Sequence, residues 1–239
     1  MNRAVIRDEL CRGLLGGLAL LALTLPPAGA YRPDAASVSP AAHRTGALRR
    51  ADFGRVAPGP EARELADWIA ASNDNAGAAF AIVDKREATV FVFDAQARHR
   101  GSSPALLGSA RGDDTVEGIG TRPIALVRPE ERTTPAGRFV AERGRNARGE
   151  DVVWVDYDAA VSMHRVLTTD PSERRLQRLA SPSADDRRIS YGCINLPVAF
   201  YEAHVRPAFA QPGGVIYVMP ESRPIRQVFG SYDVGAAPR

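Results

Sequence analysis

The sequence contains little cysteine and no paired metal-binding motif. Only two cysteines occur in 239 residues, Cys11 and Cys193, and they form no CxxC spacing. The chain also lacks an HExxH segment and a GxSxG segment. These absences argue against a zinc site and against a serine hydrolase of the nucleophile-elbow type. We therefore expect neither a metal nor a cofactor.

A strong excess of one charge is absent as well. The 31 basic side chains nearly balance 28 acidic ones, which leaves a formal net charge of +3. That balance is too mild to indicate nucleic acid as a partner. Lys85 is the only lysine, so almost all of the basic side chains are arginines.

The N-terminal region has no apolar run long enough to cross a bilayer. Its apolar stretch covers residues 13–25, well short of the roughly 20 residues that a spanning helix needs. Three arginines precede the stretch and Ala-Gly-Ala follows it at residues 28–30, as in a secretory signal peptide. We interpret residues 1–30 as a signal peptide. The mature protein is then exported, periplasmic or associated with the cell envelope, without stable membrane insertion.

Removal of the leader leaves Cys193 as the only cysteine. A lone thiol in an oxidising compartment cannot form an internal disulfide. It is therefore buried, paired with a second chain, or kept for its reactivity. The sequence predicts no particular oligomeric state.

Composition divides the rest of the chain into four parts. Residues 31–59 are rich in Ala, Pro, Ser and Arg without a hydrophobic period, which is typical of a flexible tether. Residues 60–77 begin with PEARELADWIAAS, whose proline and apolar stripe of Leu65, Trp68 and Ile69 predict a helix that docks on the next domain. Residues 78–220 form the main domain, and we expect residues 221–239 to be a tail packed on its outside.

The main domain is predicted to be mainly β with few short helices. AAFAIVD and ATVFVFD flank a polar turn and predict a hairpin. Further runs with the composition of strands are PIALV, GRFVAE, DVVWVDY, AVSMHRV and GVIYVM. The spacing of Val198, Tyr201, Val205 and Phe209 predicts one helix with a buried face.

Cysteine chemistry requires a partner, because a free thiol with a pKa of about 8.5 is mostly protonated at neutral pH. Of the four histidines, His43 lies in the tether, and His99 and His204 are expected at the surface. His164 lies in the apolar run AVSMHRV upstream of Cys193. By elimination, His164 is the best candidate for the base.

Gly192 precedes the cysteine and allows the backbone to approach a substrate closely. The backbone N–H groups of Gly192 and Cys193 are candidate donors to an oxyanion. A tight turn that requires glycine would give the same local pattern. The spacing alone therefore leaves both a catalytic and a purely structural role open.

SYGCINL, at residues 190–196, resembles the signature of the L,D-transpeptidases of the YkuD type. TTPAGRF, at residues 133–139, is similar to the TPxGxF turn of the same family, and His164 matches its upstream histidine. The resemblance covers roughly residues 80–220. It implies a YkuD-like β-sandwich-type domain without metal or cofactor, in which Cys193 and His164 are catalytic and face a groove for peptide stems. Ser190 and Tyr191 would shape the site.

The chain departs from the family pattern at three places. Asn195 stands where the family usually has arginine, and Tyr191 where it often has histidine. His164 and Cys193 are also further apart along the sequence than the family pattern leads us to expect. The arginine-rich segment between them is either a solvated loop with a helical turn or a lid over the groove. Asn195, Arg175 and Arg188 are the candidate residues for binding stem-peptide carboxylates.

The resemblance implies an exported L,D-transpeptidase that remodels peptidoglycan and takes stem peptides as its partners. Cys193 would form a thioester with the L-centre of a tetrapeptide stem, release D-Ala and pass the acyl group to an amine. An L,D-carboxypeptidase-like hydrolase on the same fold is one alternative, because water can resolve the same thioester. A non-catalytic protein that binds the cell envelope is another, because Asn195 and Tyr191 depart from the pattern.

Overall fold

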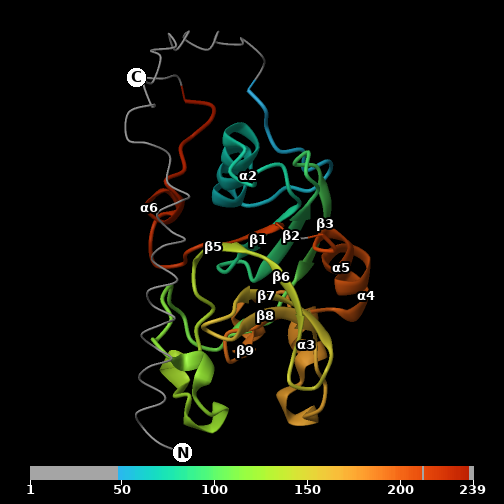
Figure 1. Ribbon diagram of the computed structural model, residues 1–239, viewed down its shortest axis with the longest axis vertical. Coiled ribbons are helices and arrows are strands. Elements are labelled where there is room, and N and C mark those ends of the chain that lie inside the picture. The colour runs from blue at the N-terminus through green and yellow to red at the C-terminus, as the bar shows by residue number, and fades with distance from the viewer. Residues whose placement is uncertain (1–47, 212, 237–239) are drawn as a thin grey trace, which may run out of the picture. The chain divides into compact units, whose positions relative to one another are not determined.

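Two β-sheets that share a hydrophobic core form the centre of the protein (Figure 1). This computed structural model describes residues 48–211 and 213–236, so the predicted signal peptide and most of the tether lie outside the described residues. The strands are β1 (Phe80–Asp84), β2 (Thr89–Phe93), β3 (His99–Pro104), β4 (Leu107–Gly108), β5 (Gly137–Val140), β6 (Glu142–Arg145), β7 (Asp151–Asp156), β8 (Val161–Arg165), β9 (Arg188–Ser190), β10 (Ile194–Leu196) and β11 (Val215–Val218).

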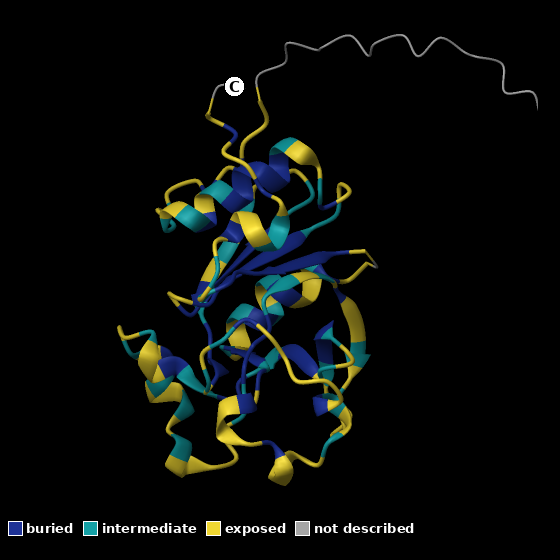
Figure 2. Ribbon diagram, turned by 90° about the vertical axis from the view of Figure 1, so that its left-hand side faces the viewer, coloured by how far each residue is buried: buried dark blue, intermediate teal, exposed yellow. Residues whose placement is uncertain are grey.

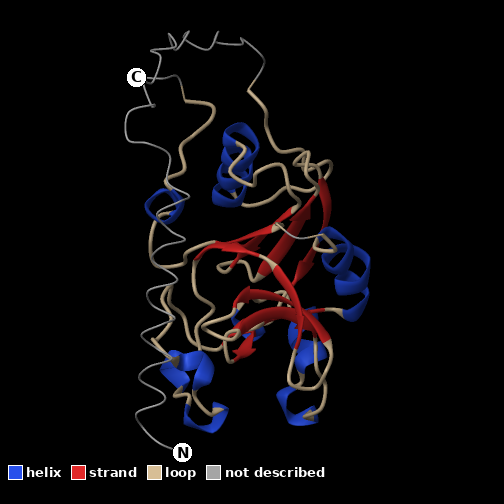
Figure 3. Cartoon of the chain, in the orientation of Figure 1, coloured by secondary structure: helices blue, strands red, loops and turns tan. Residues whose placement is uncertain are grey.

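The larger sheet has the strand order β3-β2-β1-β11-β5 and the smaller one the order β10-β8-β7-β6. Strands β4 and β9 form a separate pair. The predicted hairpin is confirmed by the antiparallel pairing of β1 with β2. The predicted runs GRFVAE, DVVWVDY, AVSMHRV and GVIYVM contain β5, β7, β8 and β11. The prediction of a mainly β fold with few short helices is thus confirmed (Figure 3).

The helices are α2 (Pro60–Ser72), α3 (Arg175–Ala180), α4 (Val198–Phe200), α5 (Arg206–Ala208) and α6 (Ile225–Phe229). A π-helical turn, η6 (Tyr201–Val205), joins α4 to α5. Short 3-10 turns are η1 (Ile119–Thr121), η2 (Ile124–Leu126), η3 (Pro129–Glu131), η4 (Pro171–Glu173) and η5 (Asp185–Arg187). No helix within the described residues is long and apolar enough to span a membrane.

The central strands β1, β2 and β11 of the larger sheet are buried on both faces, and their side-chain alternation divides the core in two (Figure 2). In β1, Ala81 and Val83 belong to the cluster shared with the smaller sheet, whereas Phe80 and Ile82 belong to the cluster beneath α2. Successive strand residues point to opposite faces, so a doubly covered strand must be apolar throughout. This explains the continuous apolar run FAIV at residues 80–83.

Helix α2 covers the outer face of the larger sheet. It occupies the predicted segment, begins after Gly59 and ends at Asn73, which has the left-handed conformation typical of a helix C-terminus. Leu65 and Ile69 are fully buried in the cluster that this face forms. The predicted apolar stripe is therefore the docking surface of the helix.

Two predicted segment boundaries are wrong. The end of the predicted tether belongs to the fold, because the Ala51 N–H donates to Asp67 at 2.9 Å and Phe53 is buried in the cluster beneath α2. The predicted tail is integrated as well, because Ile225 and Val234 are buried in the same cluster. The apolar residues of these two segments follow neither a helix nor a strand periodicity, so the sequence alone does not indicate that they are buried.

The run PIALV is not a strand, contrary to the prediction. Residues Ile124–Leu126 form the turn η2, and the side chains of Ile124 and Leu126 are each 63% exposed. Pro123, the first residue of the run, lacks an N–H for a β-ladder. In the predicted helix after Pro197, Val198 is exposed, although the other predicted apolar positions are buried.

The only lysine of the chain is wholly buried at the end of β1. Lys85 Nζ donates to the carbonyl of Gly112 at 2.6 Å, to Asp113 at 2.9 Å and to the carbonyl of Thr134 at 2.9 Å. Glu221 lies 3.7 Å from the same nitrogen. A buried charge needs such complete pairing. The ammonium thereby joins the segment before β5 and the C-terminal region to the larger sheet.

Candidate active site

Parallel pairing of β8 with β10 brings the candidate residues together. His164 on β8 is the register partner of Asn195 on β10, and Cys193 immediately precedes β10. Because side chains alternate along a strand, Ser162 shares a face with His164, and Cys193 shares one with Asn195. Ser162 is not among the site residues that the sequence predicts, although its position two residues before the candidate base is a usable signal.

The turn that carries the cysteine requires a glycine. Gly192 has φ +134°, and a Cβ at this position would lie 2.7 Å from the carbonyl oxygen of Thr133. Thr134 donates its hydroxyl to the carbonyl of Gly192 at 2.8 Å and accepts the Gly108 N–H at 2.9 Å. The segments SYGCINL and TTPAGRF, distant in sequence, are therefore in direct contact.

The Ser190 side chain forms two hydrogen bonds within the same turn. Its hydroxyl donates to the carbonyl of Cys193 at 2.6 Å and accepts the Gly192 N–H at 3.1 Å. The Gly192 N–H is thus engaged, contrary to its predicted role as an oxyanion donor. The Cys193 N–H is the remaining candidate of the predicted pair.

The thiol of Cys193 lies in a polar environment. Its sulfur is 3.8 Å from the hydroxyl of Ser162 and 3.5 Å from the carbonyl oxygen of Ala160. Burial raises the pKa of Cys193, but His164 and then Ser162 outweigh that effect and hold the pKa below its ordinary value. Proximity to an imidazole is what increases the thiolate content of a cysteine at neutral pH.

His164 is oriented by the chain next to it. Its Nδ1 lies 2.7 Å from the carbonyl oxygen of Arg165, which can only accept, so Nδ1 carries the proton and Nε2 is left as the basic nitrogen. Burial lowers the pKa of His164, but its interactions with Cys193 and the Arg165 carbonyl raise the pKa above the ordinary value. The thiol and the imidazole thus favour each other's charged form.

Asn195 is buried and its side chain is fully engaged. The amide nitrogen lies 3.3 Å from Nε2 of His164 and donates to the carbonyl of Cys193 at 3.2 Å. Its oxygen accepts a hydrogen bond from Arg175. The predicted substrate-binding role of Asn195 is therefore replaced by contacts inside the protein.

The candidate residues open into a pocket of about 310 Å³. One wall comes from the segment after β8, a second from the turn before β10, and further contributions come from η2 and from the loop between β6 and β7. The lining residues are Ile124, Arg148, His164, Leu167, Thr169, Asp170, Glu173, Arg175, Ser190, Tyr191, Cys193 and Asn195. The pocket therefore carries side chains of both charges beside an apolar surface.

Tyr191 forms part of the rim of this pocket. Its side chain is 38% exposed, and the guanidinium of Arg132 lies over its ring at 4.2 Å. This stacking fixes the ring beside the cysteine. Tyr191, at the position where the family often has histidine, therefore contributes an aromatic surface to the pocket.

Among the predicted carboxylate-binding arginines, Arg175 lines the pocket and Arg188 does not. The Arg188 side chain is 7% exposed, pairs with Glu221 at 2.6 Å and donates to the carbonyl of Lys85. Its charge is therefore already neutralised inside the protein. This placement contradicts a role for Arg188 in binding substrate.

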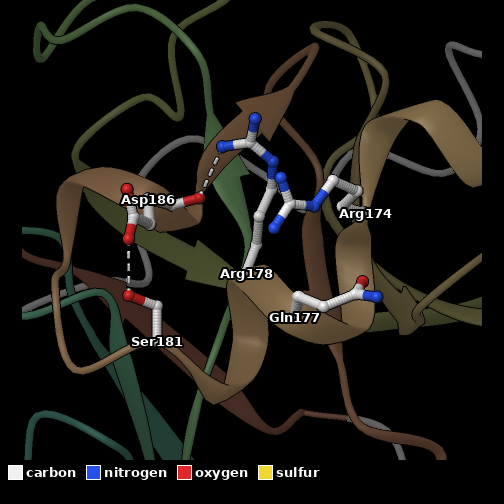
Figure 4. Close-up of a pocket in the computed structure, with 5 residues that line it drawn as sticks. All are labelled: Arg174, Gln177, Arg178, Ser181 and Asp186. Carbon is white, nitrogen blue, oxygen red and sulfur yellow. Dashed lines mark hydrogen bonds between the residues drawn. The ribbon is translucent and has the colours of Figure 1, made fainter.

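Two more arginines of the same segment face a different pocket. Arg174 and Arg178 line a cavity of about 180 Å³ together with Gln177, Ser181 and Asp186 (Figure 4). Arg178 donates to the carbonyl of Asp186 at 2.8 Å, and Ser181 donates to its carboxylate at 2.6 Å. These arginines therefore lie outside the pocket of Cys193.

The arginine-rich segment contains the short helix α3, in agreement with a loop that has a helical turn, and it is anchored to the domain at particular residues. Leu179 of α3 is buried in a small cluster with Leu106 and Val166. Arg187 donates to the carbonyls of Glu87 at 3.0 Å and Ser181 at 2.6 Å. These contacts attach the segment to the rest of the domain.

No group of three or more His, Cys, Asp or Glu side chains within residues 48–211 and 213–236 is arranged to hold a metal ion. His99 lies in β3 beside Phe53 rather than in a surface turn. His204 lines a separate pocket with Arg100 and Pro207. Neither of these two histidines is among the residues that line the pocket of Cys193.

No family model and no curated protein matches the sequence. Solved structures do match. The LD transpeptidase LdtMt1 in complex with imipenem is 18% identical over 59% of this chain and 59% of that chain, with a TM-score of 0.35. The helical cell shape determining protein Pgp2 from Campylobacter jejuni is 15% identical over 61% of this chain and 49% of that chain, with a TM-score of 0.41.

L,D-transpeptidase 3 from Mycobacterium tuberculosis, in complex with a faropenem-derived adduct, is 15% identical over 60% of each chain, with a TM-score of 0.37. The chain thus spans less than two thirds of the length of these structures. All three TM-scores are below 0.5. The similarities are therefore resemblances, and any assignment of function has to rest on the site itself.

Proposed function

We propose that the protein is an exported cysteine L,D-transpeptidase of the YkuD type that remodels peptidoglycan. The observation that carries this proposal is the arrangement of Cys193 beside His164 in a pocket, with Nδ1 of His164 bound to the Arg165 carbonyl. A nucleophile, a base and a group that orients the base are the minimum for acyl transfer through a covalent intermediate.

In the first half-reaction, Nε2 of His164 takes the thiol proton while the sulfur attacks the carbonyl carbon of the L-centre in a tetrapeptide stem. The carbonyl π electrons move to oxygen, and the Cys193 N–H stabilises the resulting oxyanion. Collapse of the intermediate breaks the bond to the D-Ala nitrogen, which receives the proton held by His164. D-Ala leaves, and a thioester remains on Cys193.

In the second half-reaction, an acceptor amine enters the same pocket. His164 removes a proton from the amine as its nitrogen attacks the thioester, and returns the proton to the departing sulfur. A new amide bond forms and the free thiol is regenerated. If water takes the place of the amine, the product is a tripeptide stem, which is the hydrolase alternative.

The lining of the pocket suits a substrate with both kinds of charge. Arg148 and Asp170 contribute opposite charges to its wall, and Ile124 and Tyr191 contribute apolar surface. Stem peptides of peptidoglycan carry carboxylates and amines along a compact backbone. Charge complementarity of this kind provides specificity and orientation for binding.

Covalent labelling tests the proposal directly. LdtMt1, one of the similar structures, is in complex with imipenem, and we expect imipenem to acylate Cys193. Intact-mass spectrometry of the purified chain should show one adduct, which Cys193→Ala abolishes and His164→Gln slows. Ser183→Ala, an exposed substitution in the adjacent segment, serves as the matched control. A folded chain without an adduct, combined with unchanged muropeptides, would favour the non-catalytic alternative.

Product analysis separates the two enzymatic outcomes. Incubation with tetrapeptide muropeptides should give crosslinked dimers if an amine resolves the thioester. Tripeptide stems alone would show that water is the acceptor and that the protein is a hydrolase. Export is tested separately, because the mature protein should begin at Tyr31 in N-terminal sequencing.

A further inference from the structure

Arg175 belongs to the inserted segment but its side chain reaches the active site. Its guanidinium binds the carboxylate of Glu173 through Nε at 2.5 Å and through Nη2 at 3.2 Å, and donates from Nη1 to the side-chain oxygen of Asn195. The Arg175 side chain is 12% exposed and Asn195 is 1% exposed. One buried partner, Asn195, and one partly exposed partner, Glu173, thus hold this arginine.

This contact determines which end of the Asn195 amide faces the imidazole. A guanidinium has five donors and no acceptor, so only the amide oxygen can face Arg175. The amide nitrogen is then directed to the opposite side, where it lies 3.3 Å from Nε2 of His164. Two donors cannot satisfy each other, so Nε2 must be the acceptor in this contact.

We propose that Arg175 is a positioning residue that orients the Asn195 amide and thereby holds His164 as a neutral imidazole whose Nε2 is unprotonated and accepts from that amide. The Arg165 carbonyl fixes the proton of this tautomer on Nδ1. Protonation of Nε2 places two N–H groups opposite each other unless the amide rotates, and Arg175 opposes that rotation. The thiolate of Cys193 favours the imidazolium. Once the sulfur has attacked and lost its negative charge, the amide contact disfavours the imidazolium, which passes its proton on.

The inference deepens the proposed function, because it rests on His164 acting as the base. Its test needs no enzymatic activity, so the two can fail separately. In the full chain carrying Cys193→Ala, the ring of His164 titrates without the thiol, and its tautomer and protonation are followed by ¹⁵N NMR. This Cys193→Ala chain is the parent for the further variants, and its His164 should show the Nδ1–H tautomer at neutral pH.

Arg175→Met removes the donor to the amide oxygen and leaves the Cys193 carbonyl as the remaining partner of the amide nitrogen. A protonated Nε2 can then turn the amide at the cost of that one hydrogen bond and bind its oxygen. We expect the ratio of imidazolium to imidazole at a fixed pH to rise about tenfold, the usual effect of one hydrogen bond to a charged group. Arg175→Lys keeps the charge and a donor, and should restore the ratio of the parent. Arg174→Met removes the same charge from the neighbouring residue, which lines the other pocket, and should shift the ratio less.

A double-mutant cycle separates orientation from charge. If Arg175 acts through the amide, Arg175→Met should have little further effect in an Asn195→Ala background. An equal shift with and without Asn195, or no shift at all, would overturn the inference. Asn195→Asp provides a second measurement, because a carboxylate presents an oxygen to Nε2 whatever Arg175 does. The ratio of imidazolium to imidazole in Asn195→Asp should exceed the ratio in Arg175→Met. A lower ratio in Asn195→Asp would contradict the inference.

Discussion

The side-chain nitrogen of Asn195 lies 3.3 Å from Nε2 of His164 because the two residues are register partners on the parallel strands β10 and β8. The same nitrogen donates to the carbonyl of Cys193 at 3.2 Å. One buried amide therefore links the candidate base to the backbone of the candidate nucleophile. This relationship makes the relative position of the two groups a property of the strand pairing.

Asn195→Ala should slow acylation of Cys193 by imipenem about tenfold, because an oriented hydrogen bond at a buried site contributes roughly one factor of ten. Single-turnover rates from intact-mass measurements report the effect. Ser183→Ala, at an exposed position that does not line the pocket, is the control. An unchanged rate for the folded Asn195→Ala chain would show that the amide does not position the site.

Ser162→Ala should raise the pKa of Cys193. The hydroxyl lies 3.8 Å from the sulfur and contributes to holding the thiol pKa below its ordinary value. Loss of that contribution shifts the alkylation profile to higher pH and lowers the rate at neutral pH by roughly threefold to tenfold. The pH dependence of iodoacetamide alkylation measures it. A midpoint equal to that of the parent would exclude the hydroxyl from thiolate stabilisation.

Gly192→Ala should destabilise the fold and remove the reactivity of Cys193. The new Cβ would lie 2.7 Å from the Thr133 carbonyl, at a φ that side chains rarely adopt. We expect a loss of at least about 2 kcal/mol in the free energy of unfolding. Gly149→Ala also has a positive φ but meets nothing within 4 Å, so denaturant titration should show a loss of about 1 kcal/mol. Equal losses at both positions would disprove the packing argument.

Asp113→Asn should destabilise the protein by about 3–5 kcal/mol, because it leaves the buried Lys85 ammonium without its nearest carboxylate. Asp114→Asn, at a side chain that is 82% exposed, should have a small effect. Urea titration at neutral pH compares the two variants. Similar losses for both would mean that the buried Lys85–Asp113 pair contributes no more to the free energy of unfolding than an exposed pair does.

The same carboxylate predicts the acid sensitivity of the fold. Burial raises the pKa of Asp113, but hydrogen bonds from Ser222, Lys85 and the Glu221 backbone lower the pKa well below its ordinary value. A depressed folded-state pKa contributes stability above the unfolded-state pKa, about 3.9, and that stability is lost as the pH falls further. The loss of stability below about pH 4 should therefore be smaller in Asp113→Asn than in the parent. An identical acid profile would assign the loss to other groups.

Much of the fold could be predicted because its signals are local. The doubly buried strands appear as continuous apolar runs, and α2 appears as a proline start followed by an apolar stripe. PIALV shows where such signals fail, because its apolar composition matches a strand while Pro123 and its exposed neighbours Ile124 and Leu126 place it in a turn. Strand formation depends on a partner strand, which composition does not reveal.

The site could be predicted in its main residues but not in its connections. Cys193 and His164 were distinguishable by scarcity, by spacing and by a resemblance to known motifs. The roles of the arginines were not, since Arg175 reaches the active site while Arg188 pairs with Glu221 in the interior. Both are arginines of the same segment, and only their packing partners separate them.

The order of residues alone thus determined the apolar framework and the scarcity of cysteine, with Cys193 as the one cysteine of the described residues. Only the tertiary structure determined that Asn195 faces His164. It also determined that Lys85 is buried, with its ammonium bound to residues distant in sequence such as Thr134. The reason is physical. Periodicity and composition act between neighbours along the chain, whereas hydrogen bonds to a buried side chain depend on distant segments being brought together by strand register and core packing.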